Sequence, residues 1–191
     1  MKIYLASKSP RRQEVLKTII SDFEVKESGF DESSIKKASP KSLVKALSEG
    51  KCQEVFNNLS GKRCVIGADT VVCYKNEILG KPKDGNDAKR MLNLLSGNTH
   101  KVLTGVCVMI TDEESITKIS FVSSSNVTFN KLTKQEIEDY VETGEPSDKA
   151  GAYAIQGLAG KFVQKISGSY HGIVGLPIAQ LYKILKEEEI I

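Results

Sequence analysis

Histidines and paired cysteines are scarce in this sequence of 191 residues. It contains two histidines and four cysteines, and no two of the cysteines form a C-x-x-C pair. A zinc site built from such ligands is therefore not expected. Three of the cysteines, Cys64, Cys73 and Cys107, lie in or beside apolar strand-like segments. We therefore expect buried free thiols in a protein of a reducing compartment.

Two motifs of common hydrolases are also missing. The sequence has no G-x-x-x-x-G-K-[ST], so it is not a P-loop enzyme, and no G-x-S-x-G, which Gly168-Ser-Tyr does not complete. His100 is expected at the start of a strand and His171 in a loop. Neither has a convincing nucleophile nearby, so the sequence does not favour Ser-His-Asp chemistry.

Long apolar runs and a strong charge imbalance are absent as well. No run approaches membrane-spanning length, and the chain enters a strand without a signal peptide, which predicts a cytoplasmic protein without a membrane partner. The 27 basic and 24 acidic residues leave a net charge of only +3, and the six phenylalanines and six tyrosines are scattered. A nucleic-acid partner is therefore not expected.

Helical and strand patterns alternate along the chain. Helical spacing predicts helices after Ser9-Pro10, after Ser39-Pro40 (interrupted at Gly50-Lys51), over 88–95, after Thr133 and after Pro177. Apolar runs predict strands at 3–6, 23–25, 64–73, 78–79 and 161–166, with a turn at Lys75-Asn76, and a hairpin from Val102 to Phe129 that turns at 112–114. This order predicts an α/β fold with a mixed, twisted sheet flanked by helices.

Asp69 lies in the middle of the most apolar strand, Cys64 to Cys73. Burying a carboxylate costs several kcal/mol unless something compensates for it. Gly67 and Ala68 precede it, and we interpret these small residues as room for a ligand. Taken alone, the stretch also fits an aspartate that caps a neighbouring turn at the end of a strand.

Cations and a second acid occur in short motifs elsewhere. Arg11 and Arg12 fall in the first turn of a predicted helix, where the helix dipole disfavours cations unless an anion binds there. Two solvated arginines are the alternative. Asp31-Glu32 and Gly80-Lys81-Pro82 add further charge in loops. Acids and cations without a thiol or histidine suit metal-assisted attack of water on a phosphate.

These motifs resemble those of the Maf nucleoside triphosphate pyrophosphatases. The opening stretch, Leu5-Ala-Ser-Lys-Ser-Pro-Arg-Arg-Gln-Glu-Val-Leu16, is similar to the family's first motif. Further matches follow in the family's order: 31–32, 67–70, 79–82, 95–97 with His100, 104–105, 144–145, 148–153, 155–157, 168–170 and 174–177. The resemblance runs from residue 5 to about residue 185.

The resemblance implies a single domain, residues 1–191, with two lobes around a cleft and an inosine-triphosphatase-like (Maf/HAM1-type) fold. It implies hydrolysis of a nucleoside triphosphate to the monophosphate and pyrophosphate with Mg²⁺ or Mn²⁺, and a link to septum formation. Asp69 matches the family's proton acceptor. Positions tied to a preference for dTTP and UTP match Arg12, Thr70 and Gln156, and other active-site positions match Ser7, Arg11, Glu32, Lys51 and Lys81.

The departures from the family pattern are small. Val15 replaces a usual leucine, Ala154 stands where glycine is common, and His171-Gly172 occupies a position where asparagine is frequent. The last two lie near the region that reads the base, so they leave the choice of nucleotide, including CTP and modified pyrimidine nucleotides, open.

As a mechanism we expect Glu32 and Asp69 to hold the metal and its water, with Asp69 as base, metal ligand or both. Lys81 would act with them, and Gln156 would pair with a pyrimidine edge, unless it is a satisfied loop amide. A nucleotide-binding regulator of cell division that does not turn its ligand over is the alternative function. The exposed edge of the hairpin would also allow a homodimer.

Overall fold

The structure is a computed structural model that describes residues 1–35, 39–75, 77–112 and 114–191. The chain forms two units: unit 1 contains residues 1–69, 104–123 and 175–191, and unit 2 contains residues 70–103 and 124–174. The predicted single domain with two lobes stays a prediction. Two positions of predicted turns, Asn76 and Glu113, lie outside the described residues.

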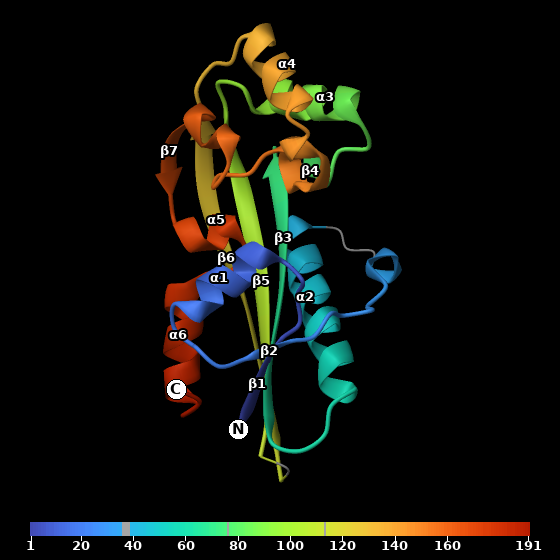
Figure 1. Cartoon of the computed structure of the whole chain (residues 1–191), viewed down its shortest axis with the longest axis vertical. Coiled ribbons are helices and arrows are strands. Elements are labelled where there is room, and N and C mark those ends of the chain that lie inside the picture. The colour runs from blue at the N-terminus through green and yellow to red at the C-terminus, as the bar shows by residue number, and fades with distance from the viewer. Residues whose placement is uncertain (36–38, 76, 113) are drawn as a thin grey trace. The chain divides into compact units, whose positions relative to one another are not determined.

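A seven-stranded sheet of parallel and antiparallel strands runs through the chain (Figure 1). Its order is β2 (Glu24–Val25), β1 (Lys2–Leu5), β3 (Arg63–Tyr74), β5 (Thr99–Thr111), β6 (Ile116–Phe129) and β7 (Val163–Ser167), and β4 (Glu77–Leu79) pairs with β3. β1 is parallel to β2 and β3, whereas β4 and β7 are antiparallel to their neighbours. β5 and β6 are sheet neighbours joined by a connection too short for a crossover, which agrees with the predicted hairpin.

Unit 1 carries three helices beside its strands. They are α1 (Pro10–Lys17), α2 (Pro40–Asn57) and α6 (Ile178–Glu187), and Figure 1 shows α2 on one side of the strands of this unit with α1 and α6 on the other. The predicted starts are confirmed for all three helices. Ser9 and Ser39 cap the first two with their side chains, and Pro177 precedes the third.

The predicted interruption of α2 at Gly50 is wrong. The helix continues without a break for 18 residues because Gly50 serves packing, not termination. A Cβ at Gly50 would lie 2.3 Å from Cζ of Phe30, so the aromatic ring occupies the space that a side chain would need. A glycine in a helix can be retained for such a close contact despite its cost in propensity.

The interpretation of Gly67 as room for a ligand is also wrong. A Cβ there would lie 2.7 Å from Cβ of Cys52 and 2.7 Å from the carbonyl oxygen of Ser48, both in α2. Gly105 in β5 makes a similar approach, because its Cβ would lie 2.3 Å from the carbonyl oxygen of Val44. The two glycines therefore let α2 lie directly against the sheet.

Unit 2 contains α3 (Gly85–Leu95), α4 (Lys134–Glu142) and α5 (Tyr170–Val174), and α3 packs against α4. The predicted capping box at Thr133 is present. Unit 2 also contains short 3₁₀ turns at Glu145–Asp148, Ala150–Ala152 and Leu158–Phe162. Unit 1 contains a similar turn at Glu32–Ser34. His171 lies in α5, so its predicted loop position is wrong, and β7 begins two residues later than predicted.

Each unit has its own apolar core. The core of unit 1 joins α2 to β1, β3 and β5 and includes Cys52 and Cys107, whereas that of unit 2 surrounds Phe129, Tyr140 and Phe162. All four cysteines are buried and free, as predicted. No helix within the described residues is long and apolar enough to span a bilayer.

Candidate functional site

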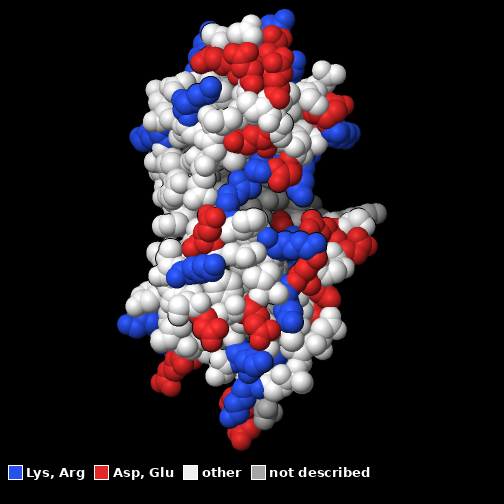
Figure 2. Space-filling model, in the orientation of Figure 1, with Lys and Arg blue, Asp and Glu red and all other residues white. Residues whose placement is uncertain are grey.

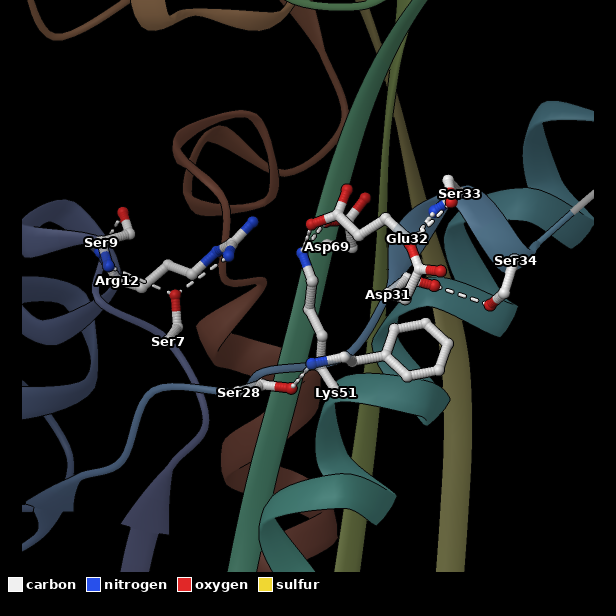
Figure 3. A network of polar contacts seen from close by, with 11 residues as sticks. Ser7, Ser9, Arg12, Ser28, Asp31, Glu32, Ser33, Ser34, Lys51 and Asp69 are labelled. Carbon is white, nitrogen blue, oxygen red and sulfur yellow. Dashed lines mark hydrogen bonds and ion pairs between the residues drawn. The ribbon is translucent and has the colours of Figure 1, made fainter.

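Lys51 connects two carboxylates in unit 1. Its Nζ lies 2.6 Å from Oδ1 of Asp69 and 2.8 Å from Oε1 of Glu32 (Figure 3). The side chains of Lys51 and Asp69 are 16% and 12% exposed, whereas that of Glu32 is 57% exposed. The buried carboxylate of Asp69 is therefore compensated by a cation, and the more exposed Glu32 forms the outer part of the same cluster.

The packing of α2 against the sheet determines where the ammonium group of Lys51 lies. Gly67 and Asp69 are two residues apart on β3, so the side chain of Asp69 projects to the same face as the empty Cβ position of Gly67, the face that α2 covers. Because Gly67 lets the helix approach closely at Cys52, the neighbouring Lys51 reaches Asp69 from the helix. The alternative of Asp69 as a turn cap is not what the structure shows, since its Oδ1 accepts a hydrogen bond from Lys51.

Asp31 and Glu32 are neighbours with different partners. Oδ1 of Asp31 accepts hydrogen bonds from the backbone N–H of Ser33 at 3.0 Å and from its hydroxyl at 2.7 Å, so Asp31 caps the short turn Glu32–Ser34. Glu32 instead contacts Lys51 (Figure 3). Of this acidic pair, Glu32 belongs to the Lys51 cluster and Asp31 shapes the loop that presents it.

Arg12 forms a second group at the start of α1. Its Nη1 donates to Oγ of Ser7 at 3.1 Å, and its Nε donates to the carbonyl oxygen of Gly175 at 3.0 Å. Burial lowers the pKa of Arg12, the charges of Asp69 and Glu32 raise it, and Arg11 lowers it. Arginine stays a cation at neutral pH in any such setting. Arg12 is therefore held in a fixed position within the electrostatic reach of both carboxylates.

The structure thus brings six predicted residues into unit 1: Ser7, Arg11, Arg12, Glu32, Lys51 and Asp69. Thr70, Lys81 and Gln156 belong to unit 2. Lys81 and Gln156 are exposed, and Thr70 directly follows Asp69 on β3. The roles predicted for these three residues stay predictions.

Three contacts made by these residues or by their neighbours in the chain were not predicted from the sequence. They are the carbonyl of Gly175 that accepts from Arg12, the ring of Phe30 against Gly50, and the carboxylate of Glu145 in unit 2, which binds the segment after Gln156. The first two join distant segments, and no local pattern indicates them. Glu145 belongs to the matched motif at 144–145, but nothing in the sequence indicates its partner.

Comparison with protein families identifies the chain. The model of the family described as "Maf-like protein" matches residues 2–188. The chain belongs to the Maf family. Curated relatives agree: a "dTTP/UTP pyrophosphatase" of Clostridium perfringens (strain SM101 / Type A) is 46% identical over 100% of this chain and 98% of the relative. One of Clostridium botulinum (strain Okra / Type B1), with the same description, is 50% identical over 97% of this chain and 96% of the relative.

A solved structure supports the fold of this Maf-family chain. "The structure of the Staphylococcus aureus Ham1 protein" aligns with 98% of this chain and 100% of that chain, with a TM-score of 0.55 and 11% sequence identity. At that identity the likeness concerns the fold alone. It confirms the predicted mixed α/β architecture of the Maf/HAM1 type.

Proposed function

We propose that this chain is a nucleoside triphosphate pyrophosphatase that hydrolyses dTTP and UTP to the monophosphate and pyrophosphate. Membership of the Maf family and the description of its full-length relatives support the activity and the substrate class. The single structural observation that carries the proposal is the position of Lys51, within 2.8 Å of both Glu32 and Asp69. Acids and a cation at one point are what hydrolysis of a phosphoanhydride requires.

In this proposal Asp69 accepts a proton from the water that attacks the α-phosphorus. A general base placed for that transfer contributes about 10²–10⁴-fold to the rate. Lys51 orients Asp69 through their ion pair, and Arg11 and Arg12 bind phosphate oxygens at the start of α1. The hydrogen bonds from Arg12 to Ser7 and Gly175 fix the guanidinium before the substrate arrives.

The acids of unit 1 fit a divalent cation of the Mg²⁺ type. Within the described residues, no group of three or more His, Cys, Asp or Glu side chains could hold a metal. Mg²⁺ is usually bound by one or two carboxylates together with water and substrate phosphates, and Glu32 and Asp69, which both contact Lys51, supply such a pair. When bound, the ion would polarise phosphoryl oxygens and favour attack by water.

The remaining parts of the proposal rest on the sequence. Gln156 reads the pyrimidine edge, Thr70 contributes to the same preference, and Lys81 stabilises charge on the phosphates. Cytoplasmic location, self-association into a homodimer, Mn²⁺ as an alternative metal and a role in septum formation stay predictions. On the face shown in Figure 2, Lys and Arg are interspersed with Asp and Glu. Such a mixed distribution of charge does not favour binding of a nucleic acid to this face.

A nucleotide panel tests the proposal. We expect release of pyrophosphate from dTTP and UTP in preference to CTP, ATP and 7-methyl-GTP, with Mg²⁺ or Mn²⁺, and none after chelation by EDTA. Recovery on adding the metal back is the control for damage by the chelator. A clear preference for 7-methyl-GTP would contradict the pyrimidine assignment, and tight binding of dTTP without product would favour the nucleotide-binding regulator.

A further inference from the structure

The segment that carries Gln156 forms a tight turn in unit 2. The backbone N–H of Gly157 donates to the carbonyl oxygen of Ala154 at 3.0 Å, so Gln156 is the third residue of a turn from Ala154 to Gly157. Ala154 is buried, whereas Gln156 is exposed. The turn therefore projects one amide side chain to the surface from a backbone that is anchored beside it.

Glu145 binds the residue that follows this turn. Its Oε2 accepts a hydrogen bond from the backbone N–H of Leu158 at 3.0 Å, and its Oε1 accepts one from the hydroxyl of Tyr140 at 2.8 Å. Tyr140 is a fully buried residue of α4 in the core of unit 2. The carboxylate thus ties the exposed turn to a rigid side chain, and a hydrogen bond to a charged acceptor is stronger than one between neutral groups.

Gly157 shows how close this approach is. A Cβ at that position would lie 2.4 Å from Oε1 and 2.5 Å from Oε2 of Glu145, so a side chain there would displace the carboxylate from its present place. The φ of Gly157 is −121°, which any residue adopts, so backbone strain does not call for glycine here. The absence of a side chain at Gly157 instead lets the carboxylate lie directly against the backbone that follows the turn.

The residue before the turn is anchored by a different pair. Tyr153 is buried, and its hydroxyl lies 2.8 Å from Nε2 of His100 on β5. The rings of His100, Phe129 and Tyr153 also pack edge to face with one another. Gln156 thus lies between two fixed points, Tyr153 before it and Leu158 after it.

We propose that Glu145 is a positioning residue for substrate choice: it fixes the turn from Ala154 to Gly157, so that the amide of Gln156 is presented in one orientation to the base. This inference rests on the proposed function, in which Gln156 reads the base. A preorganised amide discriminates between bases more sharply than one that reorients on binding, because a mismatched base then leaves it unpaired.

The test compares kcat/KM for UTP with that for ATP in the full chain. We expect Glu145→Ala to lower this ratio about three- to tenfold, the range of one lost or misaligned hydrogen bond. The change should lie in KM for UTP more than in kcat. Glu145→Gln should recover most of the ratio, because its carbonyl oxygen can accept from Leu158 and its amide can donate to the hydroxyl of Tyr140.

Four further proteins, among them Gln156→Ala itself, separate positioning from a loss of folded protein. Tyr140→Phe keeps the ring in the core and should lower the ratio less than Glu145→Ala. Glu142→Ala, an exposed acid at the end of α4, is the matched control and should leave the ratio unchanged. In a Gln156→Ala background, Glu145→Ala should produce no further change of the ratio.

The possible failures are distinguishable. A wild-type protein that hydrolyses none of the nucleotides would overturn the proposed function and this inference with it. A wild type that prefers UTP, together with an unchanged ratio in Glu145→Ala, would overturn the inference alone. An equal further loss of the ratio in the Gln156→Ala background would show that Glu145 acts otherwise than through Gln156.

Discussion

At the scale of single residues, the acids of unit 1 differ in what their partners allow them to do. Oδ1 of Asp69 lies against Lys51, and Glu32 shares the same ammonium from a more exposed position. The carboxylate of Asp31 accepts hydrogen bonds from the N–H and the hydroxyl of Ser33. Two adjacent acids, Asp31 and Glu32, therefore have separate roles, one in loop shape and one in the cluster around Lys51.

Asp69→Asn tests the catalytic role of that cluster. The amide keeps the shape of the side chain but has neither the charge nor the basicity needed to accept a proton from water. We expect kcat for dTTP to fall about 10²–10⁴-fold with the fold retained. Pyrophosphate release measures the rate, and circular dichroism measures the fold.

Asp31→Asn is the matched control for this substitution. It makes the same chemical change on an acid that caps a turn, and asparagine caps turns about as well as aspartate. It should therefore keep nearly all of the activity. Full activity of Asp69→Asn would remove Asp69 from the mechanism.

At the scale of secondary structure elements, the approach of α2 to the sheet is the feature on which the cluster depends. Gly67 and Gly105 remove the side chains that would hold the helix away, at Cys52 and at Val44 respectively. Gly50, in the helix itself, leaves room for the ring of Phe30. Lys51 reaches Asp69 because its helix lies directly on β3.

Gly67→Ala should disturb this contact. The new Cβ would meet Cβ of Cys52 and the backbone of Ser48 and Cys52 at 2.7–2.8 Å, so the helix must shift. We expect a loss of about 1–3 kcal/mol in the free energy of unfolding, the usual cost of overpacking, and a reduced kcat as Lys51 moves from Asp69. Urea denaturation measures the first effect and pyrophosphate release the second.

Gly80→Ala provides the comparison for stability. Apart from its two neighbours in the chain, no heavy atom of the described residues lies within 4 Å of the Cβ that it would add. Its free energy of unfolding should stay within about 0.5 kcal/mol of the wild type. If Gly67→Ala proved equally harmless, the close packing of α2 would not be what positions Lys51.

At the scale of the whole molecule, stability should depend on pH through a buried histidine. Burial lowers the pKa of His100 to about 4, against an ordinary value of 6.5. Nδ1 of His100 has no hydrogen-bond partner among the described residues, so protonation in the fold would leave a charged, unpaired N–H. The unfolded chain therefore binds this proton more readily than the folded chain.

The sign follows from that difference. Above about pH 6.5 the histidine is neutral in both the folded and the unfolded chain, so its full contribution to the free energy of unfolding is present. As the pH falls toward 4, up to about 3 kcal/mol of that free energy is lost, because the unfolded chain takes up the proton first. We expect His100→Gln to be less stable at pH 7 but to lose less on acidification. Denaturation in urea at pH 7 and 4.5 measures both, and parallel losses in the two proteins would contradict the assignment to His100.

Patterns that act over a few residues were predictable from the sequence. The serine caps and prolines at Ser9-Pro10 and Ser39-Pro40 begin helices because they satisfy or remove backbone N–H groups locally. The valine-rich run around Asp69 forms β3 because it buries both faces. The resemblance to the Maf family was likewise readable, and the family match confirms it.

The sequence by itself therefore determined the α/β class, the starts of most helices and the residues that carry the family resemblance. Only the tertiary structure decided which charged and polar groups come into contact. Lys51 and Asp69 are 18 positions apart, and Arg12 and Gly175 are 163 apart. Such contacts depend on how closely elements pack, and Gly50 and Gly67 look locally like a break and an open space. Their empty side-chain positions are filled by distant segments, which local patterns do not encode.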